Sequence, residues 1–474
     1  MLALLLALSA PAADAAAAPA GPAAPIAAPA PTAEAAAPAA KVAEVVIDTL
    51  LPCGLRVLTV RDMTLPVAAV TLVIETGSED DPAELPGLVH ALAYQLEQGN
   101  RELRPGEALA TTQDAGGVYR MASGLAQVRY ESVVPMSRLD AVLWVESQRL
   151  RFPNVSAARW QQTLGWAASD DQTSSRLRPE ALAYVHGSAG LGHNGREAGK
   201  VLAGLGEAAL AAQVAGKFSY ARSVLVVVAP ESPEVLLARV SPLFADLPQT
   251  GHTAPMRVVG PRPALATVPA PAMVPAESGG VAANPAEGGG SAAPGLPTVP
   301  LARQRGFTFV WPVPATAAGG AWAAAICRAI NRQKKGPEPE EARKARLSCD
   351  YEPDPRRGVL LLRPSGVEDP WALVRARLAR LAPGGVDAGL LQAQAGIVAQ
   401  GIRLAARTPQ GLARLLAMGG APSTAASGGK FQMQHRVEEL IGAAALVDPA
   451  GRERTAPGLL RVEDAVVLTF PEAR

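Results

Sequence analysis

The residues with the clearest spacing for chemistry lie around His90, in an apolar run that extends from Gly87 to Tyr94. On a helix, positions i, i+3 and i+4 lie on one face, so two imidazoles four residues apart can bind one Zn²⁺ while an acid at i+3 activates a water. This chain has Ala93 at the i+3 position and Tyr94 at the i+4 position. A catalytic zinc needs about three protein ligands, and His90 alone cannot supply them. The run therefore predicts a helix without a catalytic metal.

The remaining histidines give weaker signals. His186 and His193 flank a glycine-rich loop and could bind a metal together, but with no carboxylate or cysteine beside them a role in loop conformation is favoured. His435 begins a His-Arg-Val-Glu-Glu segment without a second histidine, which is typical of the solvated face of a helix. His90 itself is either a residual ligand or a hydrogen-bonded core residue, and a lone histidine on an apolar helix favours the second.

The elements that must position these residues follow from hydrophobic periodicity, and they predict an α+β fold. Strands are expected at 43–48, 55–60, 67–75, 118–135 (a pair), 224–228, 307–311, 358–362 and 465–470, and helices after Pro86 and at 139–151, 157–168, 178–186, 321–332, 371–381 and 390–418. We expect two half-domains, each a mostly antiparallel sheet with helices packed on one face.

Composition divides the chain into five segments. Residues 1–15 resemble an export signal, because an apolar run too short to span a bilayer is followed by Ala13-Asp14-Ala15, a cleavage-site pattern. The other segments are an Ala/Pro-rich tether at 16–41, a first half at 42–248, a Pro/Ala/Gly linker at 249–302 and a second half at 303–474. We therefore expect an exported protein of the periplasm or cell envelope, without a transmembrane span.

Overall composition excludes some classes of function. The 474 residues carry 44 Lys and Arg against 43 Asp and Glu, a net charge of +1 with no block of like charge, so no nucleic acid is expected as a partner. No Gly-x-Ser-x-Gly nucleophile elbow and no phosphate-binding glycine pattern is present. The three cysteines do not form a disulfide framework. Cys327 and Cys349 could pair in an exported protein or could both be buried small apolar residues, and the sequence leaves this open.

Several short motifs occur in a shared order through residues 43–248. They are Leu51-Pro-Cys-Gly-Leu-Arg-Val57, Glu75-Thr-Gly-Ser78, the segment around His90, Gly116-Gly117 followed by Tyr130, His193-Asn-Gly195 and the segments 218–230 and 242–248. Together they resemble the pitrilysin/insulinase-type zinc metallopeptidases, whose helix carries His-x-x-Glu-His. The resemblance implies a zinc-peptidase-like fold with two halves that close around a cavity.

The departures from this family fall on its working parts. The resemblance places a third zinc ligand, a glutamate, near Gly165 to Ala168, but no acidic residue occurs between Glu146 and Asp170. The substrate-binding positions after the glycine pair correspond to Arg120 and Ser123. Gly116, Gly117, Arg120 and Ser123 are therefore the predicted peptide-binding residues, while His90, Ala93 and Tyr94 are predicted to be a vestigial metal site.

The resemblance and its departures together predict a catalytically inactive peptidase homologue without zinc. We expect it to be the non-catalytic subunit of a heterodimeric processing peptidase, to pair with a zinc-bearing paralogue, and to contribute surface for a peptide or unfolded polypeptide. Two alternatives stay open. One is an active metalloendopeptidase with atypical ligands, and the other is a stand-alone binding or structural protein of the cell envelope.

Overall fold

The structure, a computed structural model, describes residues 45–82, 84–151, 155–169, 199, 201–250, 304–314, 319–333, 345–352, 357–367, 369–382, 384–418, 429–431, 437 and 466–471. The predicted export signal, the tether, the helix at 178–186 and nearly all of the linker lie outside these residues, as do His186, His193 and His435. The described residues belong to one compact unit, Lys41–Arg474.

Seven described strands form a mixed sheet in the order β10-β1-β2-β6-β3-β5-β4. Their bounds are β1 Val46–Leu50, β2 Arg56–Arg61, β3 Val67–Ile74, β4 Val118–Ser123, β5 Val128–Pro135, β6 Ser223–Ala229 and β10 Gly429–Phe431. Only β2 and β6 pair in parallel; every other neighbouring pair is antiparallel. The expectation of a mostly antiparallel sheet is confirmed.

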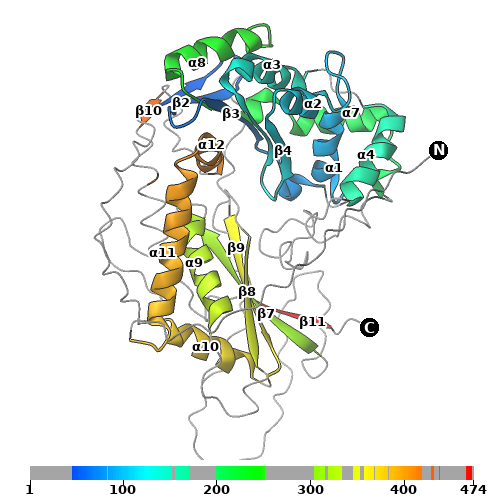
Figure 1. Cartoon of the computed structure of the whole chain (residues 1–474). Coiled ribbons are helices and arrows are strands. Elements are labelled where there is room, and N and C mark those ends of the chain that lie inside the picture. Colours follow the sequence, from blue (N-terminus) through cyan, green and yellow to red (C-terminus); the bar gives the residue numbers. More distant parts are fainter. Residues whose placement is uncertain are drawn as a thin grey trace, which may run out of the picture. The chain divides into compact units, whose positions relative to one another are not determined.

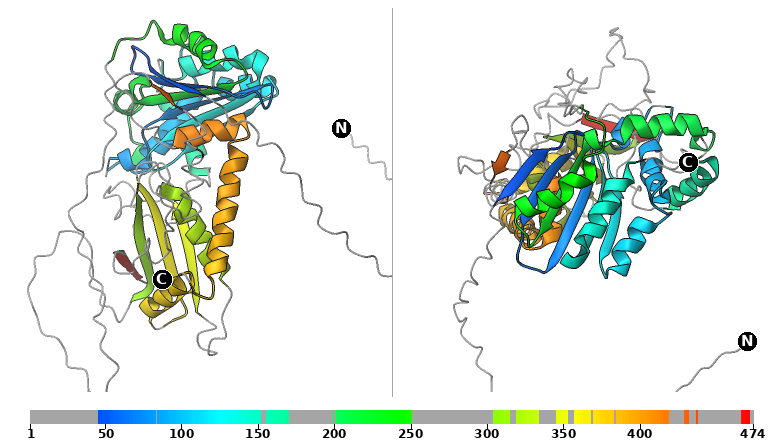
Figure 2. Two further views of the ribbon diagram at one scale, coloured as in Figure 1. Left: turned by 90° about the vertical axis from the view of Figure 1, so that its left-hand side faces the viewer. Right: turned by 90° about the horizontal axis from the view of Figure 1, so that it is seen from above.

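Helices cover both faces of this sheet, so the expectation of helices on one face is wrong here. One face packs against α1 (Leu88–Gln95), α3 (Leu139–Arg149), α4 (Ala157–Ser169), α7 (Glu207–Lys217) and α8 (Pro233–Val240). The other face packs against α12 (Pro409–Met418), which lies along the sheet in Figure 2. The cause lies in β3 and β6, whose apolar side chains do not alternate with polar ones. Strands of this kind must be covered on both sides.

The second sheet of the chain has four antiparallel strands in the order β11-β7-β9-β8 (Figure 1). Its strands are β7 Gln304–Pro314, β8 Arg346–Glu352, β9 Arg357–Ser365 and β11 Val466–Pro471, and its helices are α9 Gly319–Arg332, α10 Pro370–Arg380 and α11 Ala388–Ala405. Phe309, Trp311, Ile326, Leu360 and Val374 meet in its core. Among the described residues, the helices of this sheet share one core with a single face of it, as expected.

One predicted helix, 390–418, is two helices in the structure. α11 ends at Ala405 and α12 begins at Pro409. Proline has no backbone N–H and disfavours helical backbone in the residue before it, and the Thr408 hydroxyl accepts a hydrogen bond from the N–H of Gly411 at 3.1 Å. The position of α12 bears on the predicted division of the chain into two halves. That division stays a prediction. Both α12 and β10 come from the predicted second half, yet they complete the core and the edge of the seven-stranded sheet.

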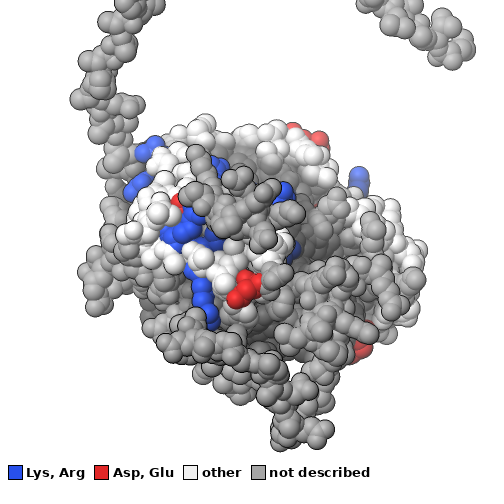
Figure 3. All heavy atoms as spheres, turned by 90° about the horizontal axis from the view of Figure 1, so that it is seen from below, with Lys and Arg blue, Asp and Glu red and all other residues white. Residues whose placement is uncertain are grey.

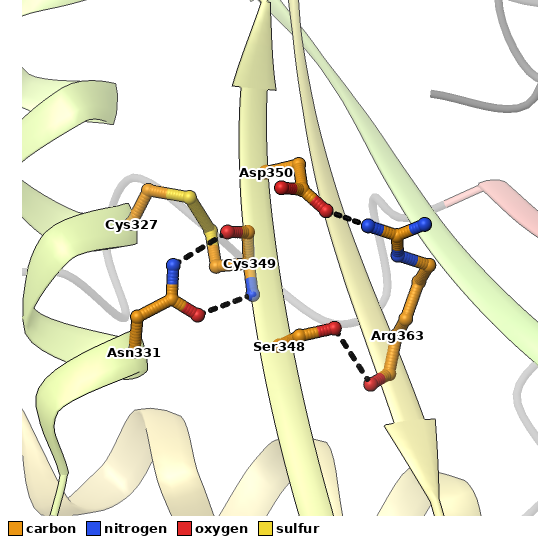
Figure 4. The surroundings of a disulfide bond; sticks show 6 residues. All are labelled: Cys327, Asn331, Ser348, Cys349, Asp350 and Arg363. Atoms are coloured by element: carbon orange, nitrogen blue, oxygen red, sulfur yellow. Dashed lines mark hydrogen bonds and ion pairs between the residues drawn. A yellow bond between two sulfur atoms is a disulfide. The ribbon is translucent and has the colours of Figure 1, made fainter. Parts of the chain in front are cut away.

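Cys327 on α9 and Cys349 on β8 form a disulfide, with their Cα atoms 5.1 Å apart (Figure 4). The side chain of Asn331, one turn along α9, lies beside it. Its amide donates to the carbonyl of Cys349 at 2.6 Å and its oxygen accepts from the N–H of Cys349 at 2.8 Å. The disulfide and these two hydrogen bonds join α9 to β8. The pairing left open by the sequence is present in the structure.

One face of the molecule shows how charged side chains lie on part of the described surface (Figure 3). In Figure 3, which views the molecule from below, Lys and Arg side chains gather near the middle of the face, with an acidic group beside them and uncharged surface around them. Helix α10 lies toward this end in Figure 1, and its Arg380 forms an ion pair with Asp387 at 2.6 Å. No helix within the described parts of the chain combines the length and apolar character needed to cross a membrane.

Candidate functional site around the His90 helix

Helix α1 begins at a turn held by Asp81. Gly87 precedes it with a positive φ of 76°, a conformation that favours glycine. The two carboxylate oxygens of Asp81 accept hydrogen bonds from the N–H groups of Gly87 and Val89, each at 2.8 Å. Burial raises the pKa of Asp81 to about 7, although both N–H groups and the nearby Lys217 act to lower it. Asp81 thus supplies acceptors for first-turn N–H groups, which have no partner inside a helix.

The three positions that the sequence predicts to be a vestigial metal site all lie on α1. His90 is buried, and its ring meets that of Tyr94 edge to face with 5.3 Å between the centroids. Ala93 is fully buried, and its carbonyl accepts a hydrogen bond from the Tyr130 hydroxyl at 2.8 Å. Burial raises the pKa of Tyr130 well above its ordinary value, so the phenol stays neutral and keeps its donor proton. A methyl group and a phenol therefore stand three and four residues after His90.

The helix expected to carry the third ligand packs against α1. On α4, the Thr163 hydroxyl donates to the side-chain oxygen of Gln95 on α1 at 2.8 Å, and both residues are buried. Trp160 is also buried and donates from its indole nitrogen to the carbonyl of Leu202 at 2.7 Å. The sequence of α4 contains no aspartate or glutamate. The segment to which the resemblance assigns the third ligand is thus helical, and it contains no carboxylate.

These residues do not fit a zinc ion. His90 is the one nitrogen ligand on the relevant face of α1, Ala93 has no donor atom, and α4 supplies no acid. Within the described part of the chain, no group of three or more His, Cys, Asp or Glu side chains is placed to hold a metal.

A buried ion network lies beneath α1. Arg149 on α3 donates from Nε and from Nη2 to the two carboxylate oxygens of Glu146, at 2.7 and 2.8 Å, and both side chains are 1% exposed. Arg149 also donates to Glu97, which accepts a second hydrogen bond from the Tyr119 hydroxyl. The guanidinium carbon of Arg149 lies 4.0 Å from the centre of the Tyr130 ring.

Arg149 stays protonated in this network because the carboxylates beside it favour its charged form. Burial alone would lower the pKa of Arg149, but the Glu146 and Glu97 carboxylates raise it well above its ordinary value. The sequence interpretation missed this network. The available signal was Glu146, which lies at helical spacing on the same apolar face as Leu139, Val142 and Leu143, because a charged residue on an apolar face is seldom buried unless paired.

The glycine pair lies between α2 (Glu107–Asp114) and β4, where backbone geometry accounts for it. Gly116 has a positive φ of 73°. A Cβ on Gly117 would lie 2.3 Å from the carbonyl oxygen of Val133, closer than real Cβ contacts allow. Both glycines therefore have a structural reason to be present, whether or not a ligand binds nearby.

The other predicted peptide-binding residues lie on β4, an edge strand of the seven-stranded sheet. Arg120 is exposed and pairs across the ladder with Glu131 of β5, while Ser123 is partly buried and pairs with Val128. Cross-strand partners share a face and alternate residues point to opposite faces. Arg120 and Ser123 therefore lie on opposite faces of the sheet. Arg120 thus lies on the same face of the sheet as Glu131, and Ser123 lies on the other face.

Comparison with solved structures shows what this fold is similar to. The chain matches the periplasmic protease PqqL from Escherichia coli with a TM-score of 0.56 and 14% identity, over 90% of this chain and 47% of PqqL. A protease from Helicobacter pylori matches with a TM-score of 0.52 and 14% identity, over 84% of this chain and 95% of that one. Pitrilysin matches with a TM-score of 0.51 and 13% identity, over 90% of this chain and 44% of pitrilysin.

The coverage of each match shows how the length of this chain compares with that of the similar proteases. This chain spans about half the length of PqqL and pitrilysin, and it covers 91% of the first half of PqqL. No protein family and no curated protein matches the sequence. The fold is therefore pitrilysin-like, and 90% of this chain is similar to the first half of PqqL.

Proposed function

We propose that this chain is a non-catalytic homologue of the pitrilysin-like peptidases that holds peptides and completes a zinc-bearing partner. One observation carries the proposal. The helix that would bind the metal and the helix that would supply the third ligand pack together as the fold requires, yet Ala93, Tyr94 and the acid-free α4 offer no ligand set with His90.

The match to the first half of PqqL supports an interaction with a complementary half. In the proposed complex a second chain would supply that half. We infer that this second chain is a paralogue with an intact His-x-x-Glu-His motif, and that the two form a heterodimer. The disulfide between Cys327 and Cys349 supports an exported protein, since disulfides persist in oxidising compartments such as the periplasm.

The peptide-binding part of the proposal rests on β4. As the last strand of the sheet order it has one described neighbour, β5, along its ladder. The outer edge of such a strand offers backbone N–H and C=O groups to which an extended peptide can add as a further strand. This mode of binding needs no metal ion.

Metal analysis and peptide cleavage test the catalytic part. We expect the purified chain, dialysed against zinc and then against buffer, to hold well under one zinc per chain and to cleave no casein. Stoichiometric zinc together with cleavage that a chelator abolishes would overturn the proposal in favour of an active peptidase with atypical ligands.

Mass measurement tests the pairing. We expect the chain, co-expressed with a zinc-motif paralogue from the same genome, to elute as a one-to-one complex whose peptidase activity exceeds that of the paralogue alone. A single species at the mass of this chain, with no gain in activity on mixing, would instead favour a stand-alone envelope protein.

A further inference from the structure

Three arginines and one glutamate meet beside the β4 edge, on the sheet face that α12 covers. Arg414 of α12 donates from Nε to a carboxylate oxygen of Glu131 at 2.8 Å. The Nε atom of Arg129 lies 3.6 Å from the other oxygen of Glu131, whose side chain is 3% exposed. Arg120 lies directly across the ladder from Glu131. Three positive charges against one negative charge leave this cluster with an excess of two.

The cluster has a fixed geometry because it stands on paired strands. Arg120 and Glu131 are cross-strand partners, and Arg129 lies two residues from Glu131 on the same strand, so all three side chains are on one face. Burial lowers the pKa of Arg129, Glu131 raises it, and the charges of Arg120 and Arg414 lower it further. Glu131 therefore offsets part of the excess positive charge at Arg129.

Arg120 is the member of the cluster that a ligand can reach. It is exposed and stands on the edge strand. Among the described residues, no hydrogen bond or ion pair with its side chain is found, whereas Arg414 and Arg129 each contact Glu131. The donors of its guanidinium group are thus not taken up by any hydrogen bond or ion pair found among the described residues.

We propose that Arg120, supported by Arg129 and Arg414, makes the β4 edge prefer extended peptides that carry an aspartate or glutamate opposite Arg120. This inference rests on the proposed addition of a peptide strand to β4. A residue placed opposite Arg120 would have its Cβ about 5 Å from that of Arg120, and opposite charges at this spacing stabilise the pair while like charges destabilise it. A carboxylate can also accept two parallel hydrogen bonds from a guanidinium group.

Three fluorescein-labelled peptides test the preference by anisotropy with the full chain. Each is a ten-residue Ser/Thr/Val peptide with one central residue, which is Glu, Gln or Lys. We expect the Glu peptide to bind several-fold more tightly than the Gln peptide, and the Lys peptide to bind most weakly. Arg120→Glu should reverse this order and Arg120→Gln should abolish it. Arg101→Glu, the same charge change at an exposed arginine that pairs with its neighbour Glu102, should leave the order intact.

The outcomes distinguish a failure of the acidic preference from a failure of strand addition to β4. Equal dissociation constants for the three peptides, or an unchanged order in both Arg120 variants, would overturn the acidic preference while leaving strand addition in place. Absence of binding by all three peptides to the folded chain would overturn strand addition to β4 and the acidic preference with it. Circular dichroism of each variant confirms that the comparison is made between folded proteins.

Discussion

At the scale of single residues, the three positions of the predicted metal site make structural contacts. Ala93 is fully buried with the Tyr130 hydroxyl against its carbonyl, and the His90 and Tyr94 rings contact each other. A glutamate at position 93 would have to place a carboxylate among apolar side chains, which is costly without a partner. The sequence could show that ligands were missing, because that depends on residue type alone. It could not show the contacts that these residues make, since Tyr130 reaches α1 only through the tertiary fold.

The Arg149 network predicts a large loss of stability on truncation. Arg149→Met leaves the carboxylate of Glu146, 1% exposed, without its two hydrogen bonds. Removal of one partner of a buried ion pair costs about 3–5 kcal/mol, so urea unfolding should show a decrease of this size in the free energy of unfolding. Arg101→Met, at an exposed ion pair with Glu102, should change it by less than about 1 kcal/mol. Similar losses in the two variants would show that the buried network does not contribute as inferred.

Asp81 predicts a specific dependence of stability on pH. Its pKa is about 7 in the folded chain and 3.8 as the ordinary value, so the folded state binds more protons than the unfolded state between these two values. The contribution of Asp81 is therefore fully present below about pH 4 and is lost as the pH rises through about 7, with a slope that approaches about 1.4 kcal/mol per pH unit.

The variant Asp81→Asn isolates this contribution, because asparagine does not titrate. We expect the melting temperature of the variant to rise relative to that of the wild type as the pH increases from 5 to 7.5, whatever constant offset the altered hydrogen bonds to Gly87 and Val89 introduce. A constant difference between the two proteins across this range would contradict the raised pKa. Other titrating groups affect both proteins alike and cancel in the comparison.

At the scale of elements, the sequence predicted several helices and strands that have a clear local pattern of apolar residues. The β-branched runs at β3 and β6 and the apolar periodicity of α3 and α9 were found at nearly their observed bounds. The helices α2 and α7 were not predicted, nor were two strands, β10 and β8. β10 has only three residues, Gly429–Phe431, and is a strand because it pairs with β1. β8 was missed because Cys349, Asp350 and Tyr351 do not form an apolar run and follow a polar stretch.

The link between α9 and β8 predicts a loss of stability on reduction. The disulfide closes a loop of 22 residues, and chain entropy gives such a cross-link a contribution of about 3 kcal/mol. The double variant Cys327→Ser/Cys349→Ser should therefore melt at a lower temperature than the oxidised wild type. Dithiothreitol should lower the melting temperature of the wild type and leave that of the double variant unchanged. An equal effect of dithiothreitol on both proteins would contradict a structural disulfide.

At the scale of the whole molecule, the sequence indicated the class of fold but not how the chain is distributed over its two sheets. An α+β architecture follows from the strands and helices that local patterns predict, and structural similarity to pitrilysin and PqqL agrees with the resemblance noted in the motifs. The contribution of α12 and β10 to the seven-stranded sheet could not be predicted, because it joins segments separated by several hundred residues. Pairing over such distances leaves no local signal.

This long-range closure also affects the order in which the chain can fold. A ribosome or a translocation channel delivers β1 and β2 long before residues 409–431, so the nascent sheet waits with the β1 edge open and with Leu58, Val60, Val226 and Val228 uncovered. Contacts of such high sequence separation form slowly, and an apolar face with an open strand edge is prone to aggregate. The protein is therefore expected to depend on chaperones until its last third has emerged, and a fragment that stops in the linker should be recovered mainly from inclusion bodies.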